Sequence, residues 1–251
     1  MGKRTNRLKA DDETLDTFYK GRILVLQKKK GYRFSVDAPL LADFIQTKSS
    51  DVLLELGTGN GIISLLLSIK PFRHITALEI QGPLADLARR NVVLNNLEER
   101  VTVREEDFRT FHSDQKFEII FANPPYIQKR GGHLSISLEK SIAKHELKCD
   151  IFDIMRKTEE SLKEEGKAFF IYPARRKDDL FRAAESHHLK IRALRFICPR
   201  ERTEANLFLS ECGFSSGSVR TYPPLILYDE NGEPTEEARQ IFTGRTHGPA
   251  F

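Results

Sequence analysis

The sequence predicts an α/β domain with a doubly wound, mostly parallel sheet. Two observations lead to this fold class. From about residue 50 onward, short apolar runs of strand length alternate with amphipathic segments of helix length. The first apolar run also ends in a glycine-rich turn that opens directly into a helical pattern. Strands that alternate with helices of roughly 10–15 residues form right-handed βαβ units, and such units build a parallel sheet.

Seven segments have the apolar or alternating pattern of β-strands. They are VLLEL at 52–56, HITALEI at 74–80, VTVREE at 101–106, FEIIFA at 117–122, KAFFIY at 167–172, IRALRFI at 191–197 and NLFLS at 206–210. Helices are expected between them, at 61–70, 82–96, about 150–165 and about 176–188. The second helix has Pro83 in its first turn, where proline is tolerated, and the third is expected to stop near Gly166.

The composition limits the class of protein. The chain has 251 residues, of which 39% are hydrophobic and 30% are charged, which is enough apolar material for a buried core. There is no apolar stretch of about 18 residues, and the charged start lacks the apolar part of a secretory signal, so we expect a cytoplasmic protein without a membrane span. Cys149, Cys198 and Cys212 are odd in number and widely spaced, which predicts reduced thiols and no metal site.

Positive charge is concentrated at the N-terminus. The segment 1–36 carries 10 Lys or Arg and 4 Asp or Glu, whereas the whole chain has a net charge of only +4. We therefore divide the chain into a basic N-terminal arm (1–36) and a domain (37–251). A basic arm beside a near-neutral body suits a polyanion such as RNA, and a solvated terminus explains the charge equally well. The candidate RNA contacts are Lys28, Lys29, Lys30, Lys129, Arg130, Arg195, Arg200 and Arg202.

In an open α/β sheet, ligands bind outside the carboxyl ends of the strands, so the loops there are the places to inspect. The first loop holds Glu55 and three glycines with G-x-G-x-G spacing, whose backbone can approach a ligand closely: Gly57, Gly59 and Gly61. The second loop begins at Glu79, whose carboxylate can accept hydrogen bonds from both hydroxyls of a ribose. An exposed strand-end glutamate is the alternative interpretation of Glu79.

The third loop begins with Asp107 and Phe108. A carboxylate in this place can accept a hydrogen bond from an adenine amino group, while the aromatic ring packs on the base. An ordinary turn residue beside a core residue is the alternative, and the interpretation as a binding pair depends on the other loops.

The fourth loop, N-P-P-Y at 123–126, is the most specific signal in the chain. Its two prolines stiffen the backbone, so the side-chain oxygen of Asn123 and the carbonyl of Pro124 become fixed acceptors. Two such acceptors can hold the two hydrogens of a planar NH₂ group, while Tyr126 offers a flat face for stacking. A rigid surface turn is the alternative, and it is disfavoured by the position of the motif directly after the fourth strand.

Together these loops resemble those of class I S-adenosylmethionine-dependent methyltransferases that methylate amino groups. The segments 31–42, 143–146 and 224–228 further resemble the bacterial tRNA(Val) adenine-N6 methyltransferases, and the likeness covers most of 20–242. One departure is Lys144, where that family often has arginine. The resemblance implies a Rossmann-like, seven-stranded sheet and S-adenosylmethionine as cofactor. It also implies methylation of the N6 amino group of adenine in RNA, with adenosine 37 of tRNA1(Val) as the expected target.

The resemblance also implies roles for the loop residues. Asn123, Pro124 and Tyr126 are the expected catalytic residues, and no metal is expected. Phe34 and Asp37 are expected either to close the methionine end of the cofactor or to serve as a core aromatic and a helix N-cap. The remaining cofactor-binding residues implied are Glu55, Gly57, Gly59, Gly61, Glu79, Asp107, Phe108 and Asn123.

Other functions stay open on the sequence. The N-P-P-Y loop also fits methylation of a protein glutamine amide or of guanine N2 in ribosomal RNA, because both present an NH₂ group. A nicotinamide-dependent oxidoreductase would suit Glu79, but neither the G-x-G-x-G spacing nor the N-P-P-Y loop is typical of that class. A non-enzymatic RNA-binding module is a further alternative, disfavoured by the intact Asn123 and Glu79.

Overall fold

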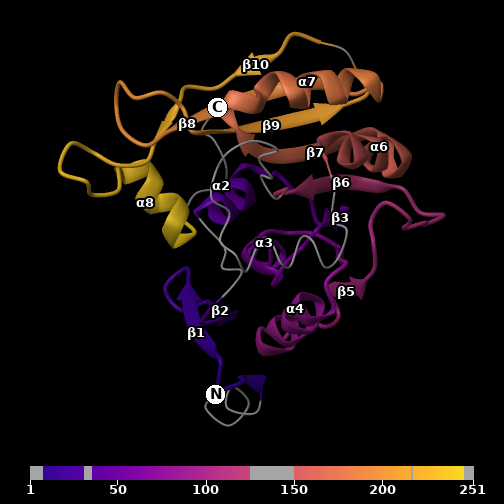
Figure 1. Cartoon of the computed structure of the whole chain (residues 1–251), viewed down its shortest axis with the longest axis vertical. Coiled ribbons are helices and arrows are strands. Elements are labelled where there is room, and N and C mark those ends of the chain that lie inside the picture. Colours follow the sequence, from indigo (N-terminus) through magenta and orange to yellow (C-terminus); the bar gives the residue numbers. More distant parts are fainter. Residues whose placement is uncertain (1–7, 31–35, 125–149, 216, 246–251) are drawn as a thin grey trace.

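The computed structural model describes residues 8–30, 36–124, 150–215 and 217–245. Its centre is a nine-stranded sheet in the order β10-β8-β9-β7-β6-β3-β4-β5, with β11 also paired to β8 (Figure 1). The seven longer strands correspond to the seven predicted ones, and the doubly wound α/β class is confirmed. The strands are β3 (Val52–Leu56), β4 (His74–Glu79), β5 (Val101–Glu105), β6 (Phe117–Ala122), β7 (Leu162–Pro173), β8 (Lys190–Cys198), β9 (Leu207–Gly213), β10 (Arg220–Thr221) and β11 (Leu225–Ile226).

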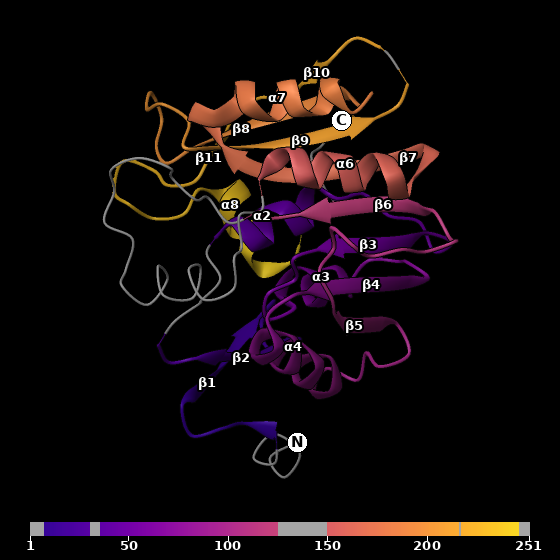
Figure 2. The same ribbon diagram turned by 45° about the vertical axis from the view of Figure 1, so that its right-hand side comes forward.

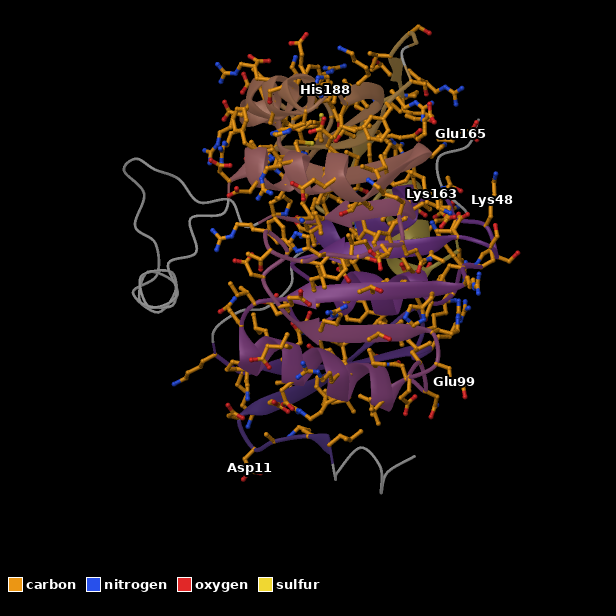
Figure 3. The ribbon with its side chains drawn as sticks, turned by 90° about the vertical axis from the view of Figure 1, so that its right-hand side faces the viewer. Asp11, Lys48, Glu99, Lys163, Glu165 and His188 are labelled. Carbon is orange, nitrogen blue, oxygen red and sulfur yellow. The ribbon has the colours of Figure 1, made fainter. Side chains whose placement is uncertain are left out.

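The sheet is mostly parallel, so its strands begin and end together. The strands β5, β4, β3, β6 and β7 pair in parallel, and β9 runs antiparallel to both β7 and β8. Figure 3 shows the consequence at one side of the molecule: Lys48, Glu99 and Lys163, which lie at or just before the amino ends of β3, β5 and β7, share that side. The carboxyl ends of the same strands therefore meet at the opposite edge.

Helices cover both faces of the sheet (Figure 2). Leu53 of β3 shares a core with α2, α3 and α8, whereas the next residue, Leu54, shares a second core with α6 and α7. Successive strand residues point to opposite faces, so one buried strand serves two layers of helices. None of the helices in the described ranges is long and apolar enough to cross a bilayer. The helices are α2 (Asp37–Phe44), α3 (Ile62–Leu67), α4 (Gly82–Leu94), α6 (Ile151–Ser161), α7 (Lys177–Ser186), α8 (Glu236–Thr243) and the 3-10 turn η1 (Ala174–Arg176).

The predicted end of the third helix near Gly166 is wrong. The helix α6 ends at Ser161, and β7 begins at Leu162 and continues through Gly166. The pairing of β7 with β6 is irregular here, because Phe117 pairs with Leu162 while Ile119 pairs with Lys167. A Cβ on Gly166 would lie 2.8 Å from the Leu162 side chain, so this glycine permits a bulge within the strand.

The N-terminal arm contains a β-hairpin that the sequence did not predict. The strands β1 (Glu13–Phe18) and β2 (Ile23–Lys28) pair antiparallel, and both views place them beside α4 (Figures 1 and 2). Leu26 of β2 is fully buried and packs with Leu87 and Leu94 of α4. Residues 13–28 of the arm are thus packed onto the domain by an apolar contact.

A buried carboxylate also fixes the hairpin. Glu13 is fully buried and accepts hydrogen bonds from both terminal nitrogens of Arg90, each at 2.8 Å. It also accepts from the amide of Ala10 at 2.9 Å and lies 3.0 Å from the Lys28 ammonium. The hydrogen bonds and charge of Arg90, together with the bonds from Ala10 and Lys28, lower the pKa of Glu13 from 4.5 to about 2. Burial by itself would raise it.

Replacing Glu13 by glutamine should lower the free energy of unfolding by about 3 kcal/mol at neutral pH, because it leaves Arg90 without its buried partner. The folded pKa lies below the unfolded one, so this stabilisation is present above pH 4.5 and is lost as pH falls through about 2. Urea unfolding measured from pH 7 to pH 2 should therefore show Glu13→Gln and wild type converging in acid. Asp12→Asn, an exposed partner of the same Lys28, is the control, and an equal loss in both variants would contradict the assignment.

Candidate active site

The strand registers bring the predicted loops to one edge. Glu55 of β3 pairs with Ala77 of β4 and with Phe121 of β6, so both neighbours end within a few residues of it. Glu79 of β4 pairs with Glu105 at the end of β5. The loops that begin after β3, β4, β5 and β6 are therefore adjacent at the carboxyl edge, as the sequence predicts.

The glycine-rich loop after β3 has a backbone that requires glycine. Gly57, Gly59 and Gly61 have φ of 75°, 60° and 86°, in the left-handed region that other residues avoid. The Gly57 and Thr58 amides donate to the carbonyl of Leu78 at 3.0 and 2.8 Å, which ties the loop to β4. A Cβ on Gly57 would meet nothing within 4 Å. The loop thus presents open backbone at this point.

Glu79 connects the second loop to the glycine-rich loop. Its carboxylate is only 5% exposed and accepts from the Gly59 amide at 2.8 Å and from the Gln81 amide at 2.9 Å. Burial raises the pKa of Glu79 despite these hydrogen bonds. The alternative of an exposed strand-end glutamate is therefore wrong, because the side chain is enclosed beside the loop.

Glu55 is the second buried carboxylate of the loop. The hydroxyls of Thr58 and Ser64 both donate to Oε2, the first at 2.6 Å, whereas Oε1 is buried without a hydrogen-bond partner among the described residues. Both polar atoms of the Asn60 side chain are also buried and lack such a partner. Burial raises the pKa of Glu55 to about 7, and the nearby charge of Glu79 adds to the shift. Buried polar atoms without partners are rare in proteins, so this loop fits a ligand with polar groups of its own.

Asp107 does not present a free carboxylate. Arg109 binds it through its side chain, with contacts of 2.7–3.1 Å, and through its amide at 2.9 Å. Burial alone would raise the pKa of Asp107, but the bonds and charge of Arg109 together lower it below its ordinary value. Phe108 is half-buried against the core under α6. A base amino group at Asp107 would thus share the carboxylate with Arg109.

A buried lysine, which the sequence did not single out, holds this third loop. Lys157 of α6 is 1% exposed, and its ammonium donates to the Phe111 carbonyl at 2.8 Å and to Glu160 at 2.5 Å. The signal available in the sequence is a lysine one turn after the apolar pair Ile154 and Met155, on the face of α6 that packs on the sheet.

The fourth loop begins where β6 ends. Asn123 is half-buried and Pro124 is buried directly after Ala122. Asp37 is the first residue of α2 and is buried, while Val36 occupies the N-cap position without a capping side chain. The N-cap alternative for Asp37 is therefore wrong. Phe34, Pro125, Tyr126, Lys129 and Arg130 lie outside the described residues.

The predicted basic residues have different surroundings. Lys28 lies 3.0 Å from both Asp12 and Glu13, and the Lys29 ammonium donates to the Asp11 carbonyl at 2.7 Å, whereas Lys30 is exposed. Arg200 and Arg202 are exposed in the loop between β8 and β9.

Arg195 requires a correction. It is 6% exposed, pairs with Glu237 of α8 at 2.6 Å and donates to the Pro223 carbonyl at 3.1 Å. This arginine joins β8 to the C-terminal segment. It belongs to the interior of the fold, and we remove it from the candidate RNA contacts.

A further basic run lies at the carboxyl edge. Arg175, Arg176 and Lys177 follow the end of β7, and Arg175 is exposed. The Ala174 amide donates to the Asn206 carbonyl at 2.9 Å, so this run adjoins the loop that carries Arg200 and Arg202. The signal in the sequence was its position directly after a strand, where ligand-contacting loops of this fold begin.

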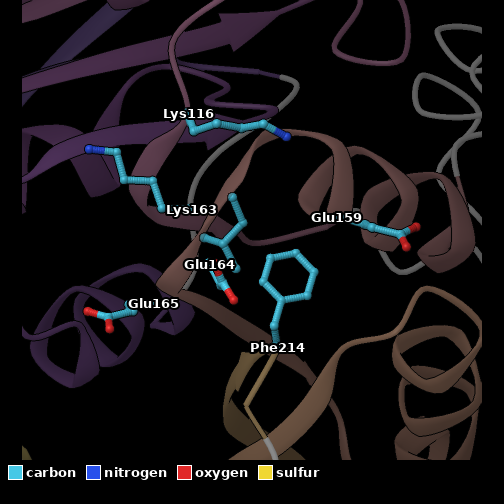
Figure 4. Close-up of a pocket in the computed structure, with 7 residues that line it drawn as sticks. Lys116, Glu159, Lys163, Glu164, Glu165 and Phe214 are labelled. Carbon is cyan, nitrogen blue, oxygen red and sulfur yellow. The ribbon is translucent and has the colours of Figure 1, made fainter.

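The structure also has a surface hollow of about 870 Å³ at the other edge (Figure 4). It lies where β6 and β7 begin, and its lining mixes both signs of charge with two apolar side chains: Lys116, Glu159, Leu162, Lys163, Glu164, Glu165 and Phe214. The glycine-rich loop and Asn123 are at the opposite ends of these strands, so the hollow is separate from the candidate site.

Comparisons with known proteins agree with this geometry. The family model described as "methyltransferase small domain" matches residues 33–175. A tRNA1(Val) (adenine(37)-N6)-methyltransferase of a Flavobacteriaceae bacterium is 28% identical over 61% of this chain and 64% of its own length. The enzyme of that name from Aliivibrio fischeri is 25% identical over 80% of this chain and 86% of its own. The crystal structure described as a predicted O-methyltransferase from Agrobacterium tumefaciens superposes with a TM-score of 0.67, at 19% identity, over 85% of this chain and 98% of that one.

The sheet order and the superposition show the fold of class I methyltransferases. The chain belongs to the methyltransferase small domain family, whose model covers more than half of it. Membership of this family argues against the alternative of a nicotinamide-dependent oxidoreductase.

The pH dependence of stability should report Glu55. A carboxyl whose folded pKa is about 7 stabilises the fold while protonated, so its contribution is lost as pH rises from 4.5 through 7. Glu55→Gln keeps the neutral form at every pH. The variant should match wild type near pH 4.5 and exceed its free energy of unfolding by about 3 kcal/mol at pH 8, measured by urea unfolding without ligand. A pH-independent difference between the two proteins would contradict the burial effect.

Proposed function

We propose that this protein transfers a methyl group from S-adenosylmethionine to the exocyclic N6 of adenine in RNA, with adenosine 37 of tRNA1(Val) as the target. The observation that carries the proposal is the placement of Asn123 and Pro124 at the same sheet edge as the glycine-rich loop and Glu79. The curated relatives bearing that name add the substrate to the proposal. The chain spans 64% of the length of the first of these relatives.

The residues around the glycine-rich loop fit the cofactor. Glu55 Oε1 and the Asn60 amide are buried polar atoms without partners among the described residues, and the amino-acid end of S-adenosylmethionine carries an ammonium and a carboxylate. The open backbone at Gly57 and the carboxylate of Glu79 suit its ribose, and Asp107 with Phe108 suits its adenine. Gly59 and Gly61 shape the loop, and Phe34 and Asp37 are proposed at the methionine end. Bound there, the cofactor would supply an electrophilic methyl on its sulfonium.

The fourth loop would activate the acceptor nitrogen. The N6 lone pair of adenine is delocalised into the ring, which makes this nitrogen a poor nucleophile. Hydrogen bonds from its two hydrogens to Asn123 Oδ1 and the Pro124 carbonyl would favour a pyramidal nitrogen whose lone pair points at the methyl group. The loop would thus work by positioning and electrostatics, without a covalent intermediate. Stacking on Tyr126 would hold an unstacked base, which is cheapest to obtain in an RNA loop.

The decisive experiment is methyl transfer from labelled S-adenosylmethionine into unmodified valine tRNA, with analysis of the product nucleosides. N6-methyladenosine is the expected product. Asn123→Ala should reduce the rate by about 10²–10³-fold while S-adenosylhomocysteine binds with nearly unchanged affinity. Asn123→Asp retains the oxygen acceptor and is the matched control, expected to keep more activity. Transfer only to ribosomal guanine or to a protein glutamine would overturn the proposed substrate.

The exposed cations at the carboxyl edge are proposed to contact the RNA backbone. Arg175, Arg200 and Arg202 lie near the end of β7, beside the end of β6 where the acceptor base would sit. Lys30 adds an exposed charge after the hairpin, and Lys28 and Lys29 stand beside it. Lys129 and Arg130 are proposed contacts that follow the N-P-P-Y loop in the sequence.

Neutralising two of these arginines should weaken RNA binding in a salt-dependent way. Each phosphate contact contributes about 0.7–0.9 to the slope of log K against log salt, so Arg200→Gln with Arg202→Gln should reduce the slope by about 1.4–1.8. The matched control is Lys48→Gln with Lys190→Gln, which removes two exposed charges at the amino edge. Filter binding to valine tRNA from 50 to 300 mM salt measures the slope, and equal changes in both double variants would remove the loop from the interface.

A further inference from the structure

The outer edge of β2 is paired with side chains of a helix. Asn91 of α4 and Asn95, the C-cap residue that follows this helix, lie about one turn apart and face Leu26 and Leu24 of β2. Asn91 accepts from the Leu26 amide at 2.7 Å and donates to its carbonyl at 3.1 Å. Asn95 does the same with Leu24, at 2.9 and 2.7 Å. Two asparagines thus bind the backbone amides and carbonyls of Leu24 and Leu26.

The match follows from the geometry of the two elements. Residues i and i+4 of a helix are separated by about 6.0 Å along its axis, and residues i and i+2 of a strand by about 6.7 Å. A primary amide carries a donor and an acceptor, as a peptide group does. Because Asn91 meets Leu26 and Asn95 meets Leu24, β2 runs antiparallel to α4. The hairpin is therefore held in one register on this helix.

The two asparagines differ in their remaining N–H. Asn95, at the C-cap, donates it to the Asn91 carbonyl in the last turn of α4, at 2.8 Å. Asn91 donates it to the Asn60 carbonyl in the glycine-rich loop, at 2.9 Å. The same peptide unit carries the Gly61 amide, which donates to the Thr58 carbonyl at 3.0 Å. Asn91 thus fixes the carbonyl side of a peptide whose amide side closes the turn of the loop.

The Asn91 contact is sheltered from water. Asn91 and Leu26 are fully buried, and Asn60 is 1% exposed. One turn before Asn91, Ala88 would lie 3.4 Å from a Cβ on Gly61, so loop and helix are in close contact. Water cannot readily replace a hydrogen bond in such a place, and any shift of β2 must disturb the amide that also holds the loop.

We propose that Asn91 is a positioning residue that couples the N-terminal hairpin to the glycine-rich loop. Ligands of the two elements therefore alter each other's affinity. The inference rests on the proposed function, in which the loop holds S-adenosylmethionine and the lysines that follow β2 face RNA. Such coupling is reciprocal: RNA that stabilises the hairpin in its docked position tightens cofactor binding by the same factor as cofactor tightens RNA binding. Asn95 anchors the hairpin without taking part in the coupling.

The test compares Asn91→Leu with Asn95→Leu in the full chain. Leucine has a similar volume and favours helix, and each variant removes one amide that binds β2. Titration calorimetry gives the dissociation constant of S-adenosylhomocysteine alone and with saturating valine tRNA. Asn91→Leu should weaken binding of S-adenosylhomocysteine by about tenfold, the loss typical of one hydrogen bond, and should abolish its dependence on RNA. For Asn95→Leu, the dissociation constant of S-adenosylhomocysteine and its change with RNA should both stay within about twofold of the wild-type values. Its melting temperature should nevertheless fall by about as much as that of Asn91→Leu.

The outcomes separate the inference from the proposed function. Equal effects of the two variants, or an unchanged RNA dependence in Asn91→Leu, would overturn the coupling and leave Asn91 a structural residue. If wild type binds no S-adenosylhomocysteine, the proposed cofactor fails, and hydrogen exchange at the Gly59–Gly61 amides decides the inference instead. Faster exchange in Asn91→Leu than in Asn95→Leu supports it, and equal exchange overturns it. If Asn91→Leu does not fold, Asn91→Asp keeps the acceptor for Leu26, removes both donors and carries the same expectations.

Discussion

The turn between β3 and α3 is the constraint on which the rest of the site depends. Its three glycines at positive φ let the chain reverse from a buried strand into a helix within five residues. Such a backbone leaves several amides without a helical or strand partner, and the neighbouring elements supply the acceptors. The Leu78 carbonyl takes two of these amides and the Glu79 carboxylate takes a third. The second loop of the site is therefore placed by the hydrogen bonding of the first.

The same constraint extends to the hairpin. Asn91 holds the turn from the side of α4 and holds β2 with its other two hydrogen bonds. The ion pair of Glu13 with Arg90, the preceding residue of α4, fixes the first strand. One face of a single helix thus connects the basic N-terminal segment to the site. The hairpin packs against α4 of the domain, although the charge of this segment suggested a separate arm.

The central sheet could be predicted because its signals are local. Each strand from β3 to β6 is an apolar or alternating run bounded by glycine, proline or a charged turn. Because these strands pair in parallel, the site residues that follow them lie at the same edge of the sheet. The hairpin could not be predicted in the same way. Its turn places Tyr19 and Lys20 at positive φ beside Gly21, and two of these residues give no turn signal. The prediction that Arg195 contacts RNA was wrong for another reason. Its partner Glu237 is 42 residues away in the sequence, and a basic cluster in a sequence does not reveal which member points inward.

The electrostatics of the site bear on the class of ligand. Glu55 and Glu79 are both buried at the glycine-rich loop, and burial raises the pKa of each. A dinucleotide would bring two negative phosphates to the loop beside Glu55, and it would need free backbone amides where Gly59 already donates to Glu79. A ligand with positive charge instead lowers the cost of ionising Glu55 and gains from both carboxylates. The buried Glu55 and the engaged Gly59 amide therefore favour a ligand with positive charge over a pyrophosphate at this loop.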